Sequence, residues 1–187
     1  MLIDRRGLAG KRILLTGGTT GFGRATLALL AADGARVLTF GRDRAALDDA
    51  LDDARTRVTG EGEVSGLTAD VATRAGIDAV FAAVDERLGG LDMLVACAAL
   101  GAQPIDEMGD DDWRYVVDTN LVGYLACARA ALTRMKRQEG GHLLFVGRSA
   151  PRSRRWAKAS MPPPRPASRP LPKRCARRSR TLTSRSA

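Results

Sequence analysis

The sequence is poor in cysteine, histidine and aromatic residues, and its last 40 residues contain no acidic residue and no glycine. The three cysteines, Cys97, Cys127 and Cys175, are scattered and odd in number, which does not favour a disulfide framework or a paired metal site. No apolar run approaches the roughly 20 residues of a membrane-spanning helix, and the N-terminus lacks the apolar core of a signal peptide. We therefore expect a cytoplasmic protein with no membrane partner and no bound metal.

The missing acidic residues divide the chain in two. Residues 1–147 carry 17 Lys/Arg, 21 Asp/Glu and all 20 glycines, for a net charge of −4. Residues 148–187 carry 13 Lys/Arg, no acid and seven of the eight prolines, for a net charge of +13. This contrast predicts one globular domain over residues 1–147. It also predicts a disordered, low-complexity Arg/Pro/Ser-rich tail over residues 148–187.

Short apolar runs alternate with helical patterns in the first 147 residues. Strands are predicted at 12–17, 35–40, 63–71, 91–98 and 142–146, and helices at about 20–34, 47–58, 77–88 and 111–137. Such alternation favours an α/β fold, a Rossmann-type doubly wound parallel sheet with helices on both faces. In these sheets a ligand binds beyond the carboxyl ends of the strands.

The stretch "TGGTTGFG", residues 16–23, lies between the first strand and the first helix. Gly17 would permit the tight turn, Gly21 would let the backbone approach a pyrophosphate, and Gly23 would allow close packing of the helix on the strand. The helix N-terminus would offer unpaired N–H groups to the phosphates. The residues that we predict to bind a dinucleotide here are Gly17, Thr19, Thr20, Gly21, Phe22 and Gly23.

The end of the second strand indicates which dinucleotide is bound. A site for NAD usually has a carboxylate there, whereas this chain has Gly41 followed by Arg42. A guanidinium suits the 2′-phosphate of NADP through charge-assisted hydrogen bonds. Asp43 weakens the positive field, and Arg42 could also be a solvated residue at a helix start. We favour NADP over NAD.

Over about residues 8–147 the chain resembles the short-chain dehydrogenase/reductase family. The opening "LAGKRILLTGGTTGFGRA" and the later "DTNLVGYLACARAAL" are similar to two family signatures. The resemblance implies that Asp70 and Val71 contact the adenine. It also implies that Asn120 is the catalytic asparagine, which kinks its helix and holds a water in a proton relay. The family's Asn-Asn-Ala-Gly corresponds to "ACAA", in which only Ala98 is kept as a cofactor contact.

The family also uses a serine after the fifth strand and a Tyr-x-x-x-Lys on the next helix. The lysine lowers the pKa of the tyrosine, which near neutrality is otherwise a poor base. In this chain Arg148 occupies the serine position, although Ser149 is adjacent. The only tyrosines, Tyr115 and Tyr124, are not followed four residues later by lysine. The chain therefore resembles the family but lacks its catalytic tyrosine and lysine.

A recombined tail, a real basic extension or a shifted reading frame would each explain this loss. Codons for "SMPPPR", residues 160–165, permit Tyr-Ala-Ala-Thr-Lys when each codon starts at the third base. In that frame the tyrosine falls 13 codons after the position of Arg148, where the family has its serine. We favour the shifted frame, because the family motif then appears at the family distance.

The function that we predict is hydride transfer between NADP(H) and a carbonyl/alcohol substrate, by a protein whose catalytic half is missing or out of frame. The small-molecule substrate applies to a full-length form, and we do not expect this chain to form the family's homo-oligomer. Two alternatives remain. The chain could be a non-catalytic NADP-binding module, or its basic tail could bind nucleic acid or anionic lipid without specificity.

Overall fold

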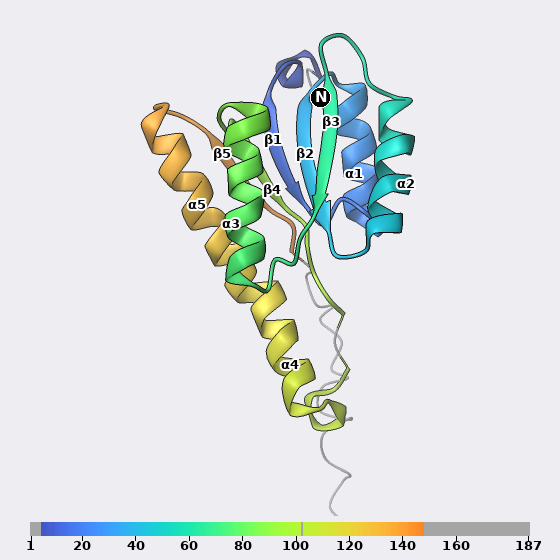
Figure 1. Ribbon diagram of the computed structural model, residues 1–187, viewed down its shortest axis with the longest axis vertical. Coiled ribbons are helices and arrows are strands. Elements are labelled where there is room, and N and C mark those ends of the chain that lie inside the picture. The colour runs from blue at the N-terminus through green and yellow to red at the C-terminus, as the bar shows by residue number, and fades with distance from the viewer. Residues whose placement is uncertain (1–4, 102, 148–187) are drawn as a thin grey trace, which may run out of the picture. The chain divides into compact units, whose positions relative to one another are not determined.

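The computed structural model describes residues 5–101 and 103–147 (Figure 1). Contacts divide the chain into two units, Met1–Gly147 and Arg148–Ala187, and the described structure belongs to the first. The basic segment of residues 148–187, which we predict to be disordered, lies outside the described residues. Arg148, Met161 and Arg165 also lie outside the described residues. In the shifted frame these positions would hold the family's serine, tyrosine and lysine.

The sheet has five parallel strands in the order β3-β2-β1-β4-β5. The strands are β1 (Arg12–Thr16), β2 (Arg36–Gly41), β3 (Glu63–Thr68), β4 (Met93–Ala96) and β5 (His142–Phe145). Every strand lies within a predicted range or differs from it by one residue. The resemblance noted above implies the strand order 3-2-1-4-5-6-7, and the described strands follow it as far as β5. The predicted Rossmann-type fold is confirmed.

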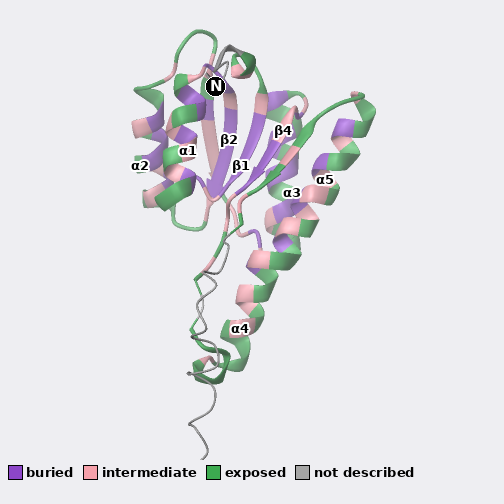
Figure 2. Ribbon diagram, turned by 180° about the vertical axis from the view of Figure 1, so that it is seen from behind, coloured by how far each residue is buried: buried purple, intermediate pink, exposed green. Residues whose placement is uncertain are grey.

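Helices cover both faces of the sheet, as Figures 1 and 2 show from opposite sides. One face packs on α1 (Gly21–Ala32) and α2 (Arg44–Arg55), and the other on α3 (Arg74–Ala83) and α5 (Gly123–Arg137). Strand β1 shows how the two cores arise. Leu14 belongs to the α3/α5 side, whereas Ile13 and Leu15 belong to the α1/α2 side, and all three are fully buried.

The long helix predicted over residues 111–137 is continuous but not uniform. It consists of α4 (Asp110–Val117), one π-helical turn, η4 (Asp118–Val122), and α5. A similar turn, η2 (Val84–Leu88), extends α3. Two short 3₁₀ turns, η1 (Arg5–Leu8) and η3 (Ile105–Glu107), complete the described elements. Helix α4 extends beyond the carboxyl edge of the sheet (Figure 1).

Strand β5 forms the exposed edge of the described sheet. Leu144 and Phe145 are 52% and 49% exposed, and the ring of Tyr124 stacks on that of Phe145 with 6.0 Å between centroids. The neighbouring Leu143 and Val146 differ from these two residues in exposure. Both are half-buried, and Leu143 packs against the core on the α3/α5 side.

Candidate functional site

A hollow of about 130 Å³ lies at the carboxyl ends of β1, β2 and β4, beside the residues that follow β3. Seven of the predicted site residues line it: Gly17, Thr19, Thr20, Arg42, Asp70, Val71 and Ala98. Gly21, Phe22, Gly23 and Asn120 do not line it. The lining also includes residues that the sequence did not suggest, among them Phe40, Leu100 and Thr119.

Two glycines of the loop make contacts that leave no room for a side chain. Gly17 has φ +70°, and a Cβ placed there would lie 2.7 Å from the Ala98 Cα. A Cβ on Gly23 would lie 2.0 Å from the carbonyl oxygen of Gly17. Gly21 differs, because it has φ +52° and no atom lies within 4 Å of its hypothetical Cβ. The loop is therefore tight at Gly17 and Gly23 and open at Gly21, where α1 begins.

Two buried threonines fix the ends of the strands around this loop. Thr16 Oγ1 accepts hydrogen bonds from the backbone N–H groups of Cys97 and Ala98, at 3.0 and 2.9 Å. Thr39 Oγ1 accepts one from Gly18 N at 3.1 Å and donates to the Leu15 carbonyl at 2.8 Å. Sequence reasoning missed both residues, although a polar residue inside an apolar strand is a signal that its hydroxyl has a buried partner.

Asn120 lies in the π-helical turn η4 and reaches the loop that follows β4. Its Oδ1 accepts a hydrogen bond from Leu100 N at 2.7 Å, and its Nδ2 donates to the Leu100 carbonyl at 2.9 Å. One N–H of the amide remains for another partner. The structure thus places Asn120 where it holds the wall of the hollow, and its catalytic role stays a prediction.

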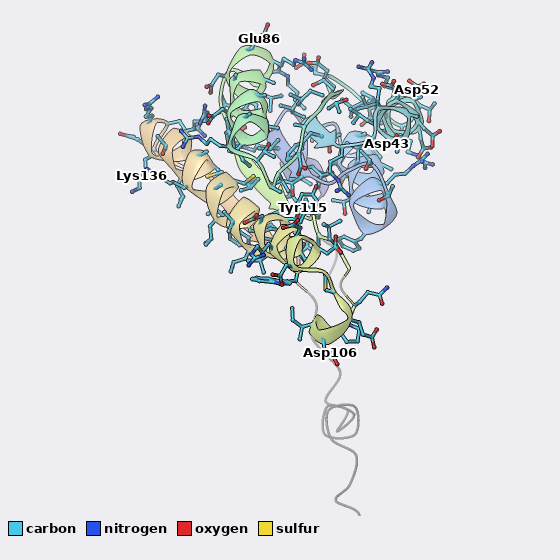
Figure 3. The ribbon with its side chains drawn as sticks, turned by 60° about the horizontal axis from the view of Figure 1, so that its bottom comes forward. Asp43, Asp52, Glu86, Asp106, Tyr115 and Lys136 are labelled. Carbon is cyan, nitrogen blue, oxygen red and sulfur yellow. The ribbon has the colours of Figure 1, made fainter. Side chains whose placement is uncertain are left out.

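Arg42, Tyr115 and Asp70 form a connected polar group at the hollow. Arg42 Nη1 donates to the Tyr115 hydroxyl at 2.6 Å, and this hydroxyl donates to Asp70 Oδ2 at 2.6 Å. Tyr115 lies on α4, where that helix passes the end of the sheet (Figure 3). Desolvation, followed by the hydrogen bond to Asp70, raises the pKa of Tyr115, so its hydroxyl keeps its proton near neutrality.

Asp43 is engaged elsewhere. Its Oδ1 accepts a hydrogen bond from Ala46 N at 2.8 Å and so caps α2. A second, open depression of about 460 Å³ adjoins this position and is lined by Thr19, Thr20, Arg42, Asp43 and Ala46. Arg42 is exposed and borders both hollows, so its charge is available to a ligand that occupies either one.

One buried polar atom in the site lacks a partner among the described residues. Thr119 is 6% exposed and lines the hollow, and its Oγ1 makes no hydrogen bond within the described part of the chain. An unsatisfied buried hydroxyl costs about 1–3 kcal/mol. A ligand in the hollow that offers a donor or acceptor would remove this cost.

The two tyrosines are not arranged as a catalytic acid or base. Tyr115 is bound to Asp70 and Arg42, and the Tyr124 hydroxyl donates to the Val146 carbonyl at 3.2 Å. Desolvation raises the pKa of Tyr124, and no lysine contacts either hydroxyl in the ranges 5–101 and 103–147. The described residues of the hollow therefore include no tyrosine–lysine pair.

A larger hollow of about 330 Å³ lies near the amino ends of β1 and β5, around Arg12, Asp92, Gln138 and His142. Its polar groups are paired with one another: Arg12 Nη2 lies 2.7 Å from Asp92 Oδ1, and Gln138 Nε2 donates to the Leu91 carbonyl at 2.7 Å. It lies at the amino ends of the strands, whereas ligands of parallel α/β sheets bind at the carboxyl ends. The hollow of about 130 Å³ at the carboxyl ends of β1, β2 and β4 is the better candidate for the functional site.

Within residues 5–101 and 103–147, no cluster of three or more His, Cys, Asp or Glu side chains is placed to hold a metal ion. No helix in the part of the chain that the structure describes is long and apolar enough to cross a membrane.

Comparisons with known proteins agree with this fold. The chain is 34% identical over 141 residues to a 3beta-hydroxysteroid dehydrogenase of Mediterraneibacter gnavus, covering 73% of this chain and 49% of that protein. It is 32% identical to the NADP-dependent 3-hydroxy acid dehydrogenase YdfG of Salmonella typhi, covering 74% and 54% of the two chains. The chain thus spans about half the length of the curated relatives that it matches.

A solved NADH-dependent reductase, A1-R′, in complex with NAD superposes with a TM-score of 0.67 at 27% identity. The match covers 76% of this chain and 61% of the reductase. The family model for short chain dehydrogenases matches residues 11–158. The chain therefore belongs to the short-chain dehydrogenase family.

Proposed function

We propose that this chain carries the cofactor-binding part of an oxidoreductase that transfers hydride between NADP(H) and a carbonyl/alcohol substrate. The observation that carries the choice of NADP is the placement of Arg42. It follows β2 directly, it borders both hollows, and the carboxylate next to it in the sequence, Asp43, caps α2. A 2′-phosphate would find a cation there that, within the described part of the chain, uses only Nη1 in a hydrogen bond, to Tyr115.

The residues of the site suit a dinucleotide in other respects. The open space at Gly21, at the first turn of α1, would accept a pyrophosphate close to the backbone. Asp70, Val71 and the unpartnered hydroxyl of Thr119 would meet the adenine end. When bound, the nicotinamide supplies the site that gives or takes the hydride. The role of Asn120 would be to hold the loop at Leu100 in place beside it.

The direct test compares cofactor affinities of the full chain and two variants. Titration with NADPH and NADH, followed by cofactor fluorescence, should show tighter binding of NADPH. Arg42→Gln should weaken NADPH binding about 10- to 100-fold, the value of a charge-assisted contact, and leave NADH binding within about twofold.

Arg44→Gln is the matched control, because Arg44 is a neighbouring exposed arginine whose partner is Asp48. Its affinities should equal those of the unaltered chain. Equal affinities for NADPH and NADH in the unaltered chain would refute the NADP assignment, and no binding of either would refute the cofactor site.

A second candidate function is a binding module without turnover. It is supported by the described residues, which line a hollow at the carboxyl ends of the strands but include no tyrosine–lysine pair. It predicts NADPH binding with no oxidation of the cofactor in the presence of a panel of ketones and aldehydes. Steady turnover with any of them would exclude it.

A further inference from the structure

We infer that Tyr115 is a positioning residue for 2′-phosphate recognition: its hydroxyl keeps Arg42 apart from Asp70 and presents the guanidinium to the cofactor. The inference rests on the proposed NADP site. It goes beyond it by assigning a role to a residue on α4, which is 73 positions from Arg42 and 45 from Asp70 in the sequence.

The directions of the two hydrogen bonds carry the first step. The Tyr115 hydroxyl donates its single proton to Asp70, so toward any other group it can only accept a hydrogen bond. Arg42 Nη1 donates that second hydrogen bond. The Arg42 guanidinium carbon also lies 5.5 Å from the centre of the Tyr115 ring, a cation–π distance. The Arg42 guanidinium is therefore held by one hydrogen bond to the Tyr115 hydroxyl and by its contact with the Tyr115 ring.

The second step concerns what Arg42 does not contact. In the described part of the chain, Arg42 forms no ion pair within 4.0 Å of any carboxylate, and its other N–H groups make no hydrogen bond. The hydroxyl stands between a cation and an anion that would otherwise attract each other. Without it, Arg42 and Asp70 are free to pair directly, which would neutralise the charge and occupy donors that a phosphate needs.

The third step separates this role from a merely structural one. No residue of α4 is buried, so the contacts of Tyr115 with Arg42 and Asp70 also help to hold this helix beside the segments that follow β2 and β3. If Tyr115 only held α4 in place, loss of its hydroxyl would weaken the binding of all ligands of the hollow equally. A positioning role would affect a ligand with a 2′-phosphate far more than one without it.

The experiment uses the full chain and two fragments of the cofactor, adenosine 2′,5′-bisphosphate and adenosine 5′-monophosphate, measured by isothermal titration calorimetry. Tyr115→Phe keeps the ring and removes the hydroxyl. We expect this variant to lose about tenfold in affinity for the bisphosphate and less than twofold for the monophosphate. In an Arg42→Gln background the same change should have no further effect on the bisphosphate, because the group that it positions is gone.

Tyr124→Phe is the matched control, because it removes the other tyrosine hydroxyl from the same continuous helix at a contact with Val146. It should leave the ratio of the two affinities unchanged. Equal losses for both fragments in Tyr115→Phe would overturn the inference in favour of a tether, and no loss would overturn it outright. If the unaltered chain binds both fragments equally or neither, the proposed NADP site itself fails, and the inference fails with it.

Discussion

Asn120 and Leu100 are joined by two hydrogen bonds, one to each polar group of the Leu100 backbone. In a strand, the N–H and carbonyl of Leu100 would pair with a neighbouring strand. In the loop after β4, the side-chain amide of Asn120 takes the place of that strand. This pairing explains why a polar residue is tolerated inside a long helix. It also ties the wall of the candidate site to the helix η4–α5.

Removal of this pairing should loosen the loop. Asn120→Ala leaves both polar groups of Leu100 without their partner, and we expect the free energy of unfolding in urea to fall by about 1–3 kcal/mol. Hydrogen exchange at the Leu100 amide should accelerate. Asp118→Ala, an exposed change in the same turn, is the control and should stay within about 0.5 kcal/mol of the unaltered chain. An Asn120→Ala protein as stable as this control would contradict the anchoring role.

The glycine loop offers a pair of substitutions with different expected costs. Gly23→Ala places a Cβ 2.0 Å from the backbone oxygen of Gly17, so α1 must move away from the loop. We expect a loss of several kcal/mol in the free energy of unfolding, or no folded protein. Gly21→Ala meets no atom within 4 Å and has only the strain of φ +52°, about 1 kcal/mol.

The same pair distinguishes packing from ligand approach. Gly21→Ala should remain folded by circular dichroism and yet bind NADPH more weakly, because its methyl group enters the open space. Equal stability of the two variants would show that the close contact at Gly23 does not limit the packing of α1. Unchanged NADPH binding by Gly21→Ala would show that the cofactor does not approach this backbone.

Most of the fold was predictable because its signals are local. Short strand-like runs and helical spacing of apolar residues predicted all five strands and the main helices. The strand order came from the resemblance to a family and not from the pattern. The π-helical turn at Asp118–Val122 was not predicted in this form. The resemblance implied a kink at Asn120, but a spacing pattern does not distinguish one extra residue in a turn.

The site was predictable in part, for a related reason. Loop residues that are adjacent in the sequence, such as Thr19 and Thr20, were found from the glycine pattern. Tyr115 was examined only as a possible catalytic tyrosine, because its contacts with Arg42 and Asp70 join three separate elements. Thr119 was missed because burial without a partner has no sequence signature. Such residues become visible only when the chain is folded.

The ion pair of Arg12 and Asp92 predicts a specific dependence of stability on pH. Hydrogen bonds from Arg12, through Nε at 3.0 Å, Nη2 at 2.7 Å and the backbone N at 2.9 Å, lower the pKa of Asp92 to about 2. Because the pKa is lower in the folded state than in the unfolded state, the stabilisation is complete above about pH 4 and is lost as the pH falls through 2.

The size of the effect follows from the shift. We expect the free energy of unfolding to fall by about 2 kcal/mol more between pH 4 and pH 2 in the unaltered chain than in Asp92→Asn, measured with urea at each pH. Asp78→Asn, which removes a carboxylate from an exposed i,i+4 pair with Arg74, should leave the steep dependence in place. Parallel pH curves for the unaltered chain and Asp92→Asn would remove the ion pair as the cause.

The last prediction concerns the encoding DNA beyond codon 140. The chain belongs to the short-chain dehydrogenase family, whereas Arg148, Met161 and Arg165 stand at the positions where the resemblance places a serine, a tyrosine and a lysine. Since "SMPPPR" permits a Tyr-Ala-Ala-Thr-Lys reading in the shifted frame, we expect that a one-base change near codon 147 restores all three residues.

Resequencing of this region is the measurement, and expression of the restored frame is its functional control. The restored protein should oxidise NADPH with a carbonyl substrate, while the chain described above should bind the cofactor without turnover. A shifted frame whose third bases give another residue at the tyrosine or lysine position would reject the idea on sequence alone. In that case the basic segment is a part of the protein in its own right. Salt-dependent binding of polyanions, with and without residues 148–187, would then become the relevant assay.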